Sequence, residues 1–160
     1  MRRALAVFAA AVLLSACGFH LRGEATLPFD TLYVEGSTAL LQELKRNIAT
    51  GTGTRLVNQA STAQAVFAVD HEIREKVILA LDVSGQVRQF ELRLRVGFRV
   101  RDAKGRDWLP LNEIVLTREV SFANQPLASE AEEALLYRDM QSDMVQQIVR
   151  RLAASHLAQG

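Results

Sequence analysis

The sequence of 160 residues is short of three things: cysteine, net charge and long apolar runs. It has one cysteine, and a single thiol cannot form an internal disulfide, so no disulfide framework is expected. Its formal net charge is +1, and a nearly neutral chain exerts no long-range attraction on nucleic acid. No segment has the ~20 consecutive apolar residues that a membrane-spanning helix needs. We therefore expect neither a nucleic-acid partner nor a helix that crosses a membrane.

The sequence also lacks the motifs of common enzyme and metal sites. It has no Gly-x-Ser-x-Gly nucleophile turn, no phosphate-binding loop and no dinucleotide fingerprint. His20, His71 and His156 lie far apart and have no metal-ligand spacing with cysteine or acidic residues. His71 falls among the apolar residues of a strand pattern, where a packed histidine is expected rather than a general base. We predict no catalytic residue, no metal and no cofactor; a catalytic group assembled without a motif is the alternative.

The N-terminus carries the most distinctive pattern in the chain. Arg2 and Arg3 precede an apolar run over residues 4–14, which together have the form of a signal peptide. The run ends in Leu-Ser-Ala-Cys17, which resembles the bacterial lipobox. At a lipobox the cysteine thiol is diacylated, the chain is cut before the cysteine and the new amine is acylated. We predict that residues 1–16 are removed and that Cys17 carries lipid; an ordinary secretory signal and a first buried helix are the alternatives.

Removal of residues 1–16 would leave 144 residues, which is one domain of ordinary size. The mature chain would have 17 basic and 18 acidic side chains, so any recognition of anions must come from local patches. Residues 17–28 show little periodicity and are predicted to be a lipidated tether. The single domain is then predicted over residues 29–160.

A strand and a helix are predicted at the start of this domain. Residues 31–35 are rich in β-branched and aromatic side chains and end at Gly36, as strands do. Leu40, Leu41, Leu44 and Ile48 then recur at helical spacing. Ser37 or Thr38 can cap this helix, because a side-chain oxygen there accepts from a free helix N–H.

Two long alternating strands follow, with a turn at Ser84-Gly85 between them. A period of two places alternate residues on opposite faces of a sheet. The predicted apolar face takes odd residues of the first strand and even residues of the second: Phe67, Val69, Ile73, Val77, Leu79, Leu81, Phe90, Leu92, Leu94, Val96, Phe98 and Val100. After a second turn over residues 102–107, a further strand points Ile114, Leu116, Val120 and Phe122 inward, with Arg118 interrupting that set.

The last predicted element is a helix of about 25 residues that starts at Ser129. It carries an apolar row at i, i+4 spacing, made of Leu136, Met140, Met144, Ile148 and Leu152. The element order is therefore β-α-β-β-β-α. One-sided alternation indicates a sheet covered on one face, so we predict an α+β two-layer sandwich. It has a four-stranded, mostly antiparallel (mixed) sheet with two helices on one face and a parallel first strand.

A row of arginines remains on the predicted uncovered face, at Arg93, Arg95, Arg99 and Arg101. One interpretation is a solvated face whose long side chains cover the backbone. The other is a surface that meets a polar or anionic partner. Lipid phosphates would fit, because a guanidinium binds phosphate with paired hydrogen bonds. The hydrophilic interior of an outer-membrane barrel would also fit.

Cys17 is followed by Gly-Phe-His-Leu-Arg22, and at this point the sequence resembles the LptE family of lipopolysaccharide-assembly lipoproteins, formerly called rare lipoprotein B. The resemblance extends over the mature chain through three weaker motifs, which are Ser84-Gly85-Gln86, the stretch 121–126 and Arg138-Asp139-Met140. It implies a fold of two helices on a four-stranded sheet, in agreement with the pattern. Gly18 replaces the aspartate that typically retains lipoproteins at the inner membrane.

The resemblance also implies a function. Family members plug the large outer-membrane β-barrel LptD, help it to fold and take part in inserting lipopolysaccharide into the outer leaflet. The expected partners are therefore LptD, lipopolysaccharide and the membrane that holds the lipid anchor. The expected location is the periplasmic side of the outer membrane and the barrel lumen.

The family's proposed lipid contacts cannot be carried over residue by residue, because the stretch 129–133 is acidic here. Arg88, Arg93 and Arg95 are our own candidates for binding lipopolysaccharide or another anion. Two other functions stay open, a lipid-anchored periplasmic binding domain for another amphiphile and an anchored cell-wall enzyme.

Overall fold

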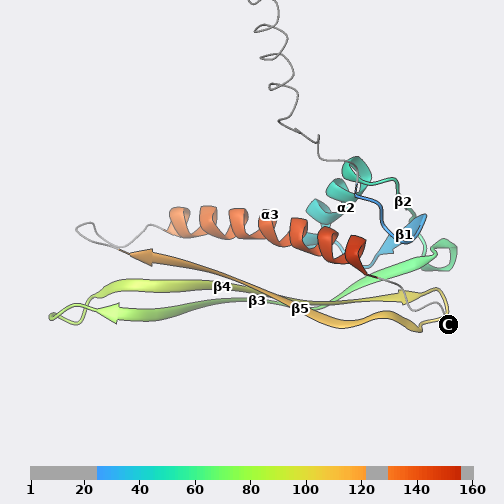
Figure 1. Cartoon of the computed structure of the whole chain (residues 1–160). Coiled ribbons are helices and arrows are strands. Elements are labelled where there is room, and N and C mark those ends of the chain that lie inside the picture. Colours follow the sequence, from blue (N-terminus) through green and yellow to red (C-terminus); the bar gives the residue numbers. More distant parts are fainter. Residues whose placement is uncertain (1–24, 122–129, 156–160) are drawn as a thin grey trace, which may run out of the picture.

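The structure, a computed structural model, describes residues 25–121 and 130–155. It is an open sheet with two helices on one face (Figure 1). The strand order is β2-β1-β3-β4-β5. The predicted α+β sandwich is confirmed, but the sheet has five strands rather than four. The additional strand, β2 (Arg55–Leu56), has two residues, which are too few to show a period.

Gly36 and the capping residue Thr38 set the end of the first strand and the start of the first described helix. β1 (Thr31–Val34) ends before Gly36, whose φ of 94° lets the chain turn toward the helix layer. α2 (Ala39–Gly51) begins after Thr38, whose hydroxyl accepts from the backbone N–H of Leu41. The predicted helix is confirmed, and its four predicted apolar residues are the buried ones. A single 3₁₀ turn, η1 (Ala60–Thr62), leads from β2 into β3.

Three long strands form the rest of the sheet. β3 (Ala65–Leu81), β4 (Val87–Asp102) and β5 (Asp107–Ser121) run antiparallel in sequence order. β1 runs parallel to β3, as predicted, but pairs only with its first three residues. β3 and β4 therefore extend well beyond β1 as a twisted hairpin (Figure 1).

β4 has the two faces that its sequence predicts. Its six even-numbered apolar residues are at most 1% exposed, and they are Phe90, Leu92, Leu94, Val96, Phe98 and Val100. Its odd-numbered arginines are half-buried on the opposite face, which no described helix covers. We call this second surface the open face; it consists of the odd-numbered residues of β4 and their cross-strand partners on β3 and β5.

β3 departs from its predicted pattern at Asp70. A register shift between Val69 and His71 leaves Asp70 without a partner on β4, which is how a β-bulge inserts one extra residue. Before the bulge, odd residues such as Phe67 share the face of the core. After it, Ile73 lies opposite Arg95, and Val77 lies opposite Glu91. The prediction that Ile73 and Val77 point into the core is therefore wrong. It is also wrong for Leu79 and Leu81, which are exposed.

α3 (Glu130–Ala154) has the predicted length of 25 residues. Met140, Met144, Ile148 and Leu152 are fully buried on one side of it. β5 contributes Ile114, Leu116 and Val120 to the same layer, since they lie opposite the buried residues of β4. Arg118 interrupts this set because its guanidinium reaches Asp143 of α3 at 2.5 Å.

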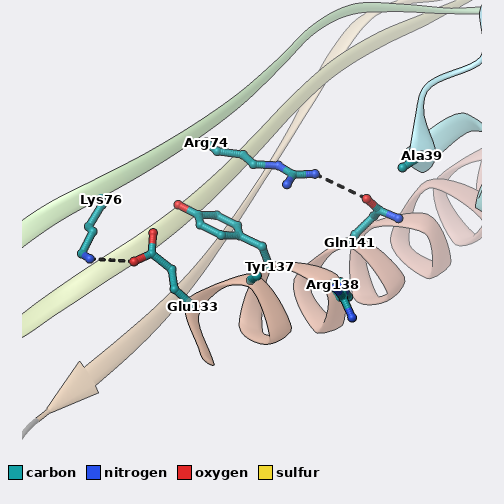
Figure 2. A pocket seen from close by; sticks show the side chains of 8 residues that line it. Ala39, Arg74, Lys76, Glu133, Tyr137, Arg138 and Gln141 are labelled. Carbon is teal, nitrogen blue, oxygen red and sulfur yellow. Dashed lines mark hydrogen bonds and ion pairs between the residues drawn. The ribbon is translucent and has the colours of Figure 1, made fainter. Parts of the chain in front are cut away.

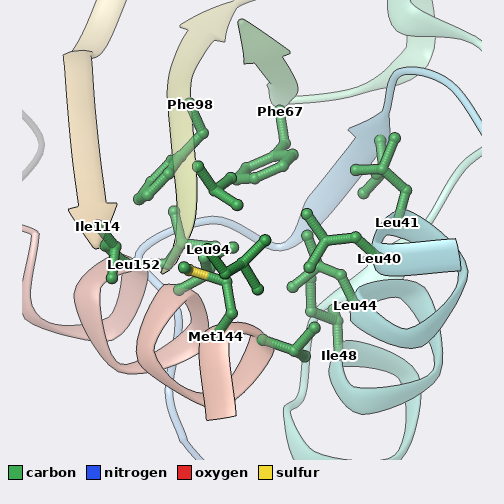
Figure 3. Packing of buried hydrophobic residues seen from close by; sticks show 14 of the residues in the cluster. Leu40, Leu41, Leu44, Ile48, Phe67, Leu94, Phe98, Ile114, Met144 and Leu152 are labelled. Carbon is green, nitrogen blue, oxygen red and sulfur yellow. The ribbon is translucent and has the colours of Figure 1, made fainter. Parts of the chain in front are cut away.

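The core joins both helices to the end of the sheet where β1 pairs with β3 (Figure 3). We call this end the body, and we call the far end of the β3–β4 hairpin, at Ser84-Gly85, the tip. Phe67 and Phe98 stack with their ring centroids 5.4 Å apart. Leu27 and Phe29 belong to the same cluster. The predicted signal peptide, Cys17 and the first part of the tether lie outside the described residues, as do Phe122 and the start of the last helix at Ser129.

Candidate interaction surfaces

The arginines of the open face are each held by a carboxylate. Arg93 pairs with Glu91, Arg95 with Glu75 at 3.8 Å, Arg99 with Asp70 at 2.8 Å and Arg101 with Glu35 at 3.5 Å. The acids come from β3, from β4 and from Glu35, the residue after β1, so the face carries both signs of charge side by side. An anionic ligand would have to displace these carboxylates to reach the guanidinium groups.

His71 is the centre of a charged cluster on the open face. Its Nε2 lies 2.9 Å from Glu113 and its Nδ1 lies 3.2 Å from Asp70. Only a protonated ring can donate from both nitrogens. Hydrogen bonds to Glu113 and then to Asp70 raise the pKa of His71 above its usual value. The pKa of Asp70 is lowered by its hydrogen bonds with His71 and Arg99.

Gly97 makes room for this cluster. It lies opposite His71 on β4, and a Cβ added there would come within 2.3 Å of the imidazole Cε1. Our placement of His71 on the apolar face was wrong, because the bulge at Asp70 moves it to the other side of the sheet. The three consecutive polar residues from Asp70 to Glu72, in the middle of an apolar alternation, are the signal that could have indicated the bulge.

The tip of the β3–β4 hairpin is closed by Asp82. Its Oδ1 accepts from the Ser84 hydroxyl at 2.6 Å and from the N–H groups of Ser84 and Gln86 at 2.9 Å. These bonds, led by that from the Ser84 hydroxyl, lower the pKa of Asp82 to about 2. The surrounding apolar side chains are exposed, and they are Ile78, Leu79, Leu81 and Val83.

The three candidate arginines are not gathered into one site. Arg93 and Arg95 share the open face. Arg88 belongs to the tip, where its Nε donates to Oδ2 of Asp82 at 3.0 Å. The Nε of Arg95 is buried and has no hydrogen-bond partner among the described residues.

A groove of about 870 Å³ lies between β3 and α3 (Figure 2). Arg74 and Lys76 of β3 point into it, because they lie opposite the buried Leu94 and Leu92. Lys76 bonds to Glu133 at 2.6 Å, and Arg74 bonds to Gln141 at 3.4 Å. The Tyr137 hydroxyl donates to the backbone carbonyl of Glu75 at 2.8 Å, which fixes α3 to this strand.

Sequence reasoning missed this groove. Its charged residues come from β3 and α3, which are about sixty residues apart in the chain, so no local spacing connects them. Within the described ranges, no helix is long and apolar enough to cross a membrane. In the same residues, no three histidine, cysteine or acidic side chains are grouped so that they could hold a metal ion.

Comparison with known proteins identifies relatives of the whole domain. The model of a family described as "LptE: Lipopolysaccharide-assembly" matches residues 29–152. The solution structure of an uncharacterized lipoprotein B from Nitrosomonas europaea is 41% identical, with a TM-score of 0.72. That match covers 86% of this chain and 91% of the other.

Two further solved structures share the fold. A minor lipoprotein from Acinetobacter baumannii is 24% identical with a TM-score of 0.67, over 82% of this chain and 96% of the other. The rare lipoprotein B of Shewanella oneidensis is 19% identical with a TM-score of 0.65, over 78% of this chain and 94% of the other. Comparison with curated proteins finds no match.

Proposed function

This chain belongs to the LptE family of lipopolysaccharide assembly, and from that premise we propose that it is a lipid-anchored plug and assembly partner of the outer-membrane barrel LptD. In this role it takes part in inserting lipopolysaccharide into the outer leaflet and has no catalytic activity of its own. The observation that carries the proposal is the family match over residues 29–152, which is nearly the whole predicted domain.

The open face supports a location inside a barrel. It is mostly charged, since arginines of β4 pair with acids of β3 and β4, with Ile73 and Val115 exposed beside them. The interior of an outer-membrane barrel is hydrophilic. A face whose charges are already paired can lie against such an interior without leaving an isolated charge away from water, which would be costly.

Lipidation at Cys17 supplies the anchor in this proposal. Cys17→Ala removes the thiol, so the variant should lose incorporation of radioactive fatty acid and leave the outer-membrane fraction. Gly18→Asp is the matched control: it keeps the thiol and should stay labelled, but be retained at the inner membrane. Persistent labelling of the Cys17→Ala chain would contradict the anchor.

Lipopolysaccharide contact is proposed at Arg88, Arg93 and Arg95. The ion pair of Arg95 with Glu75, at 3.8 Å, is longer than those of Arg99 and Arg101, so an anion displaces this carboxylate more easily. Lipopolysaccharide that co-purifies with the protein should decrease in a variant with all three changed to alanine. A variant with Arg99 and Arg101 changed to alanine is the control for loss of positive charge. Equal losses in both would remove the three arginines as specific contacts.

Depletion of this protein tests the function as a whole. The barrel should then be poorly assembled, which is measured by its folded fraction in outer membranes, and lipopolysaccharide at the cell surface should fall. Restoring the full chain should restore both. Normal barrel assembly and normal lipopolysaccharide export after depletion would rule the proposal out.

A further inference from the structure

One edge of the sheet is open over most of its length. β1 pairs with Ala65, Val66 and Phe67 of β3, and the backbone N–H of Glu35 donates to the carbonyl of Phe67. Beyond Phe67, no described strand pairs with this edge of β3. Its outward N–H and C=O groups therefore have no strand partner, and such an edge is a template for pairing with another chain.

The open edge contains a regular stretch long enough for a full strand. Register shifts interrupt β3 between Val69 and His71 and between Ile78 and Ala80. Between them, His71–Ile78 pairs with β4 residue by residue. Eight residues exceed the usual strand length of five or six. A partner strand that pairs here would take over the Glu75 carbonyl, which accepts from the Tyr137 hydroxyl in the free chain.

The groove beside this edge selects the partner's charge. Arg74, Lys76 and Arg138 line it with positive charge (Figure 2). Glu72 holds Arg74 at 3.1 Å and Glu133 holds Lys76 at 2.6 Å. Arg138 is exposed and makes no ion pair with a residue that the structure describes. A strand added next to β3 would direct every second side chain toward α3 and into this groove. Acidic side chains at those positions would meet Arg138, the one cation of the groove that no described acid holds.

We propose that His71–Ile78 of β3 accepts an extended, acidic segment of the barrel partner as an added strand, with its acidic side chains entering the groove between β3 and α3. Main-chain hydrogen bonds supply affinity in this mode of recognition, and the side-chain groove supplies specificity. The inference rests on the proposed function, because the barrel is the partner named there.

The opposite edge, on β5, offers less positive charge to an added strand. Pro110, which has no N–H to donate to a ladder, interrupts only its start, and residues 112–121 pair regularly with β4. Arg118, the cation that β5 directs toward α3, is already held by Asp143 at 2.5 Å. β5 therefore serves as the internal control for protection of β3.

Amide hydrogen exchange tests the added strand. The lipidated full-length chain is measured alone and as the complex co-purified with the barrel, using peptides that cover residues 70–81 and 107–121. In the free chain, roughly half of the amides in 71–78 should exchange fast, because alternate N–H groups point outward. In the complex they should slow at least about tenfold, with a smaller change in β5. A complex that leaves 71–78 as exposed as before would overturn the inference.

A charge reversal tests the groove. Arg74→Glu combined with Lys76→Glu should weaken the complex by about tenfold or more. Arg118→Glu, on the helix-facing side of β5, is the control for Arg74→Glu and Lys76→Glu taken singly, and should weaken the complex less than either. Equal weakening would overturn the groove as the selective element. Protection of 71–78 in a free chain that sediments as a dimer would assign the edge to a second copy instead. Failure to form any complex would refute the proposed function itself, and this inference with it.

Discussion

β4 is bounded by two turns that have the same hydrogen-bond pattern but lie in different surroundings. At the tip, Gly85 has a φ of 81° and Asp82 accepts from the N–H groups of Ser84 and Gln86. At the body end, Gly105 has a φ of 83° and Asp102 accepts from the corresponding N–H groups, two and four residues later in the chain. An arginine Nε donates to the second carboxylate oxygen in both turns.

The two turns differ in what lies behind them. Asp102 is opposite the buried Ala65, and the neighbouring Phe67 and Val100 belong to the core. Around Asp82, Leu81 is 57% exposed and Val83 is fully exposed. The comparison teaches that local hydrogen bonds suffice to shape a turn, whereas apolar burial decides how stable the strand ends beside it are. The tip thus keeps its form while leaving its apolar side chains free for contact.

The largest difference between the two regions should appear on truncation of leucines. Leu94→Ala removes a fully buried side chain and should lower the free energy of unfolding by about 3–5 kcal/mol. Leu81→Ala, at the tip, should change it by less than about 0.5 kcal/mol, as exposed substitutions do. Urea unfolding of both variants measures this. Similar losses would mean that the tip is packed against something in the free protein.

Gly97→Ala should have the next largest effect on the free energy of unfolding, because a Cβ at this position has no room beside the His71 ring. The added Cβ forces the His71 ring away and breaks its bonds to Glu113 and Asp70. Crowding of this kind costs roughly 1–3 kcal/mol. In a His71→Ala background the same change should cost much less, which a double-mutant cycle of unfolding free energies measures. Additive effects would show that the ring does not restrict residue 97.

Acid should destabilise both turns, and this loss of stability should be smaller than the effect of Gly97→Ala. Burial alone would raise the pKa of Asp102, but hydrogen bonds from Arg106 and Lys104 outweigh it and lower the pKa. A lowered folded-state pKa stabilises the protein above the unfolded value of 3.8 and ceases to do so as the pH falls through the folded value. For Asp82 that window runs from 3.8 to about 2.

Asp82→Asn and Asp102→Asn isolate this contribution. Each variant should lose stability at pH 7 and lose less than the wild type between pH 4 and pH 2, as measured by thermal unfolding at each pH. Asp102→Asn should cost more, because its side chain is 7% exposed against 16% for Asp82. A larger cost at the tip would reverse the comparison between the turns.

His71 should produce the smallest effect and the opposite pH dependence. Its pKa is raised above 6.5 by Glu113 and Asp70. The stabilisation is therefore complete below pH 6.5 and is lost as the pH rises through the folded-state value. An NMR titration of the imidazole should give that raised pKa, and Glu113→Gln should lower it. An imidazole that titrates at or below 6.5 in the folded chain would contradict the cluster.

The sequence predicted those elements whose pattern is unbroken. α2, α3 and β4 each repeat their apolar residues without interruption, and one face of each is buried as expected. β3 was assigned to the correct residues but to the wrong face beyond Val69, because a bulge is defined against a partner strand. Its own sequence shows only a cluster of polar residues there.

The candidate surfaces were less predictable than the fold. The arginine row was found, but its carboxylate partners come from β3, from β4 and from the residue after β1. Which acid meets which arginine depends on register, which a single strand does not reveal. The groove beside β3 depends on the distance between that strand and α3, which is set by packing and not by any motif.

The extra residue at Asp70 also decides which face of the sheet each later side chain of β3 occupies. Without it, Ile73 and Val77 would turn to the helix side, and Arg74 and Lys76 would turn to the other face. Deletion of one codon would thus exchange the side chains that β3 presents on the two surfaces of the hairpin, while leaving its length and composition almost unchanged. Among relatives of this chain, a gain or loss of one residue at this position would matter more for binding than many substitutions.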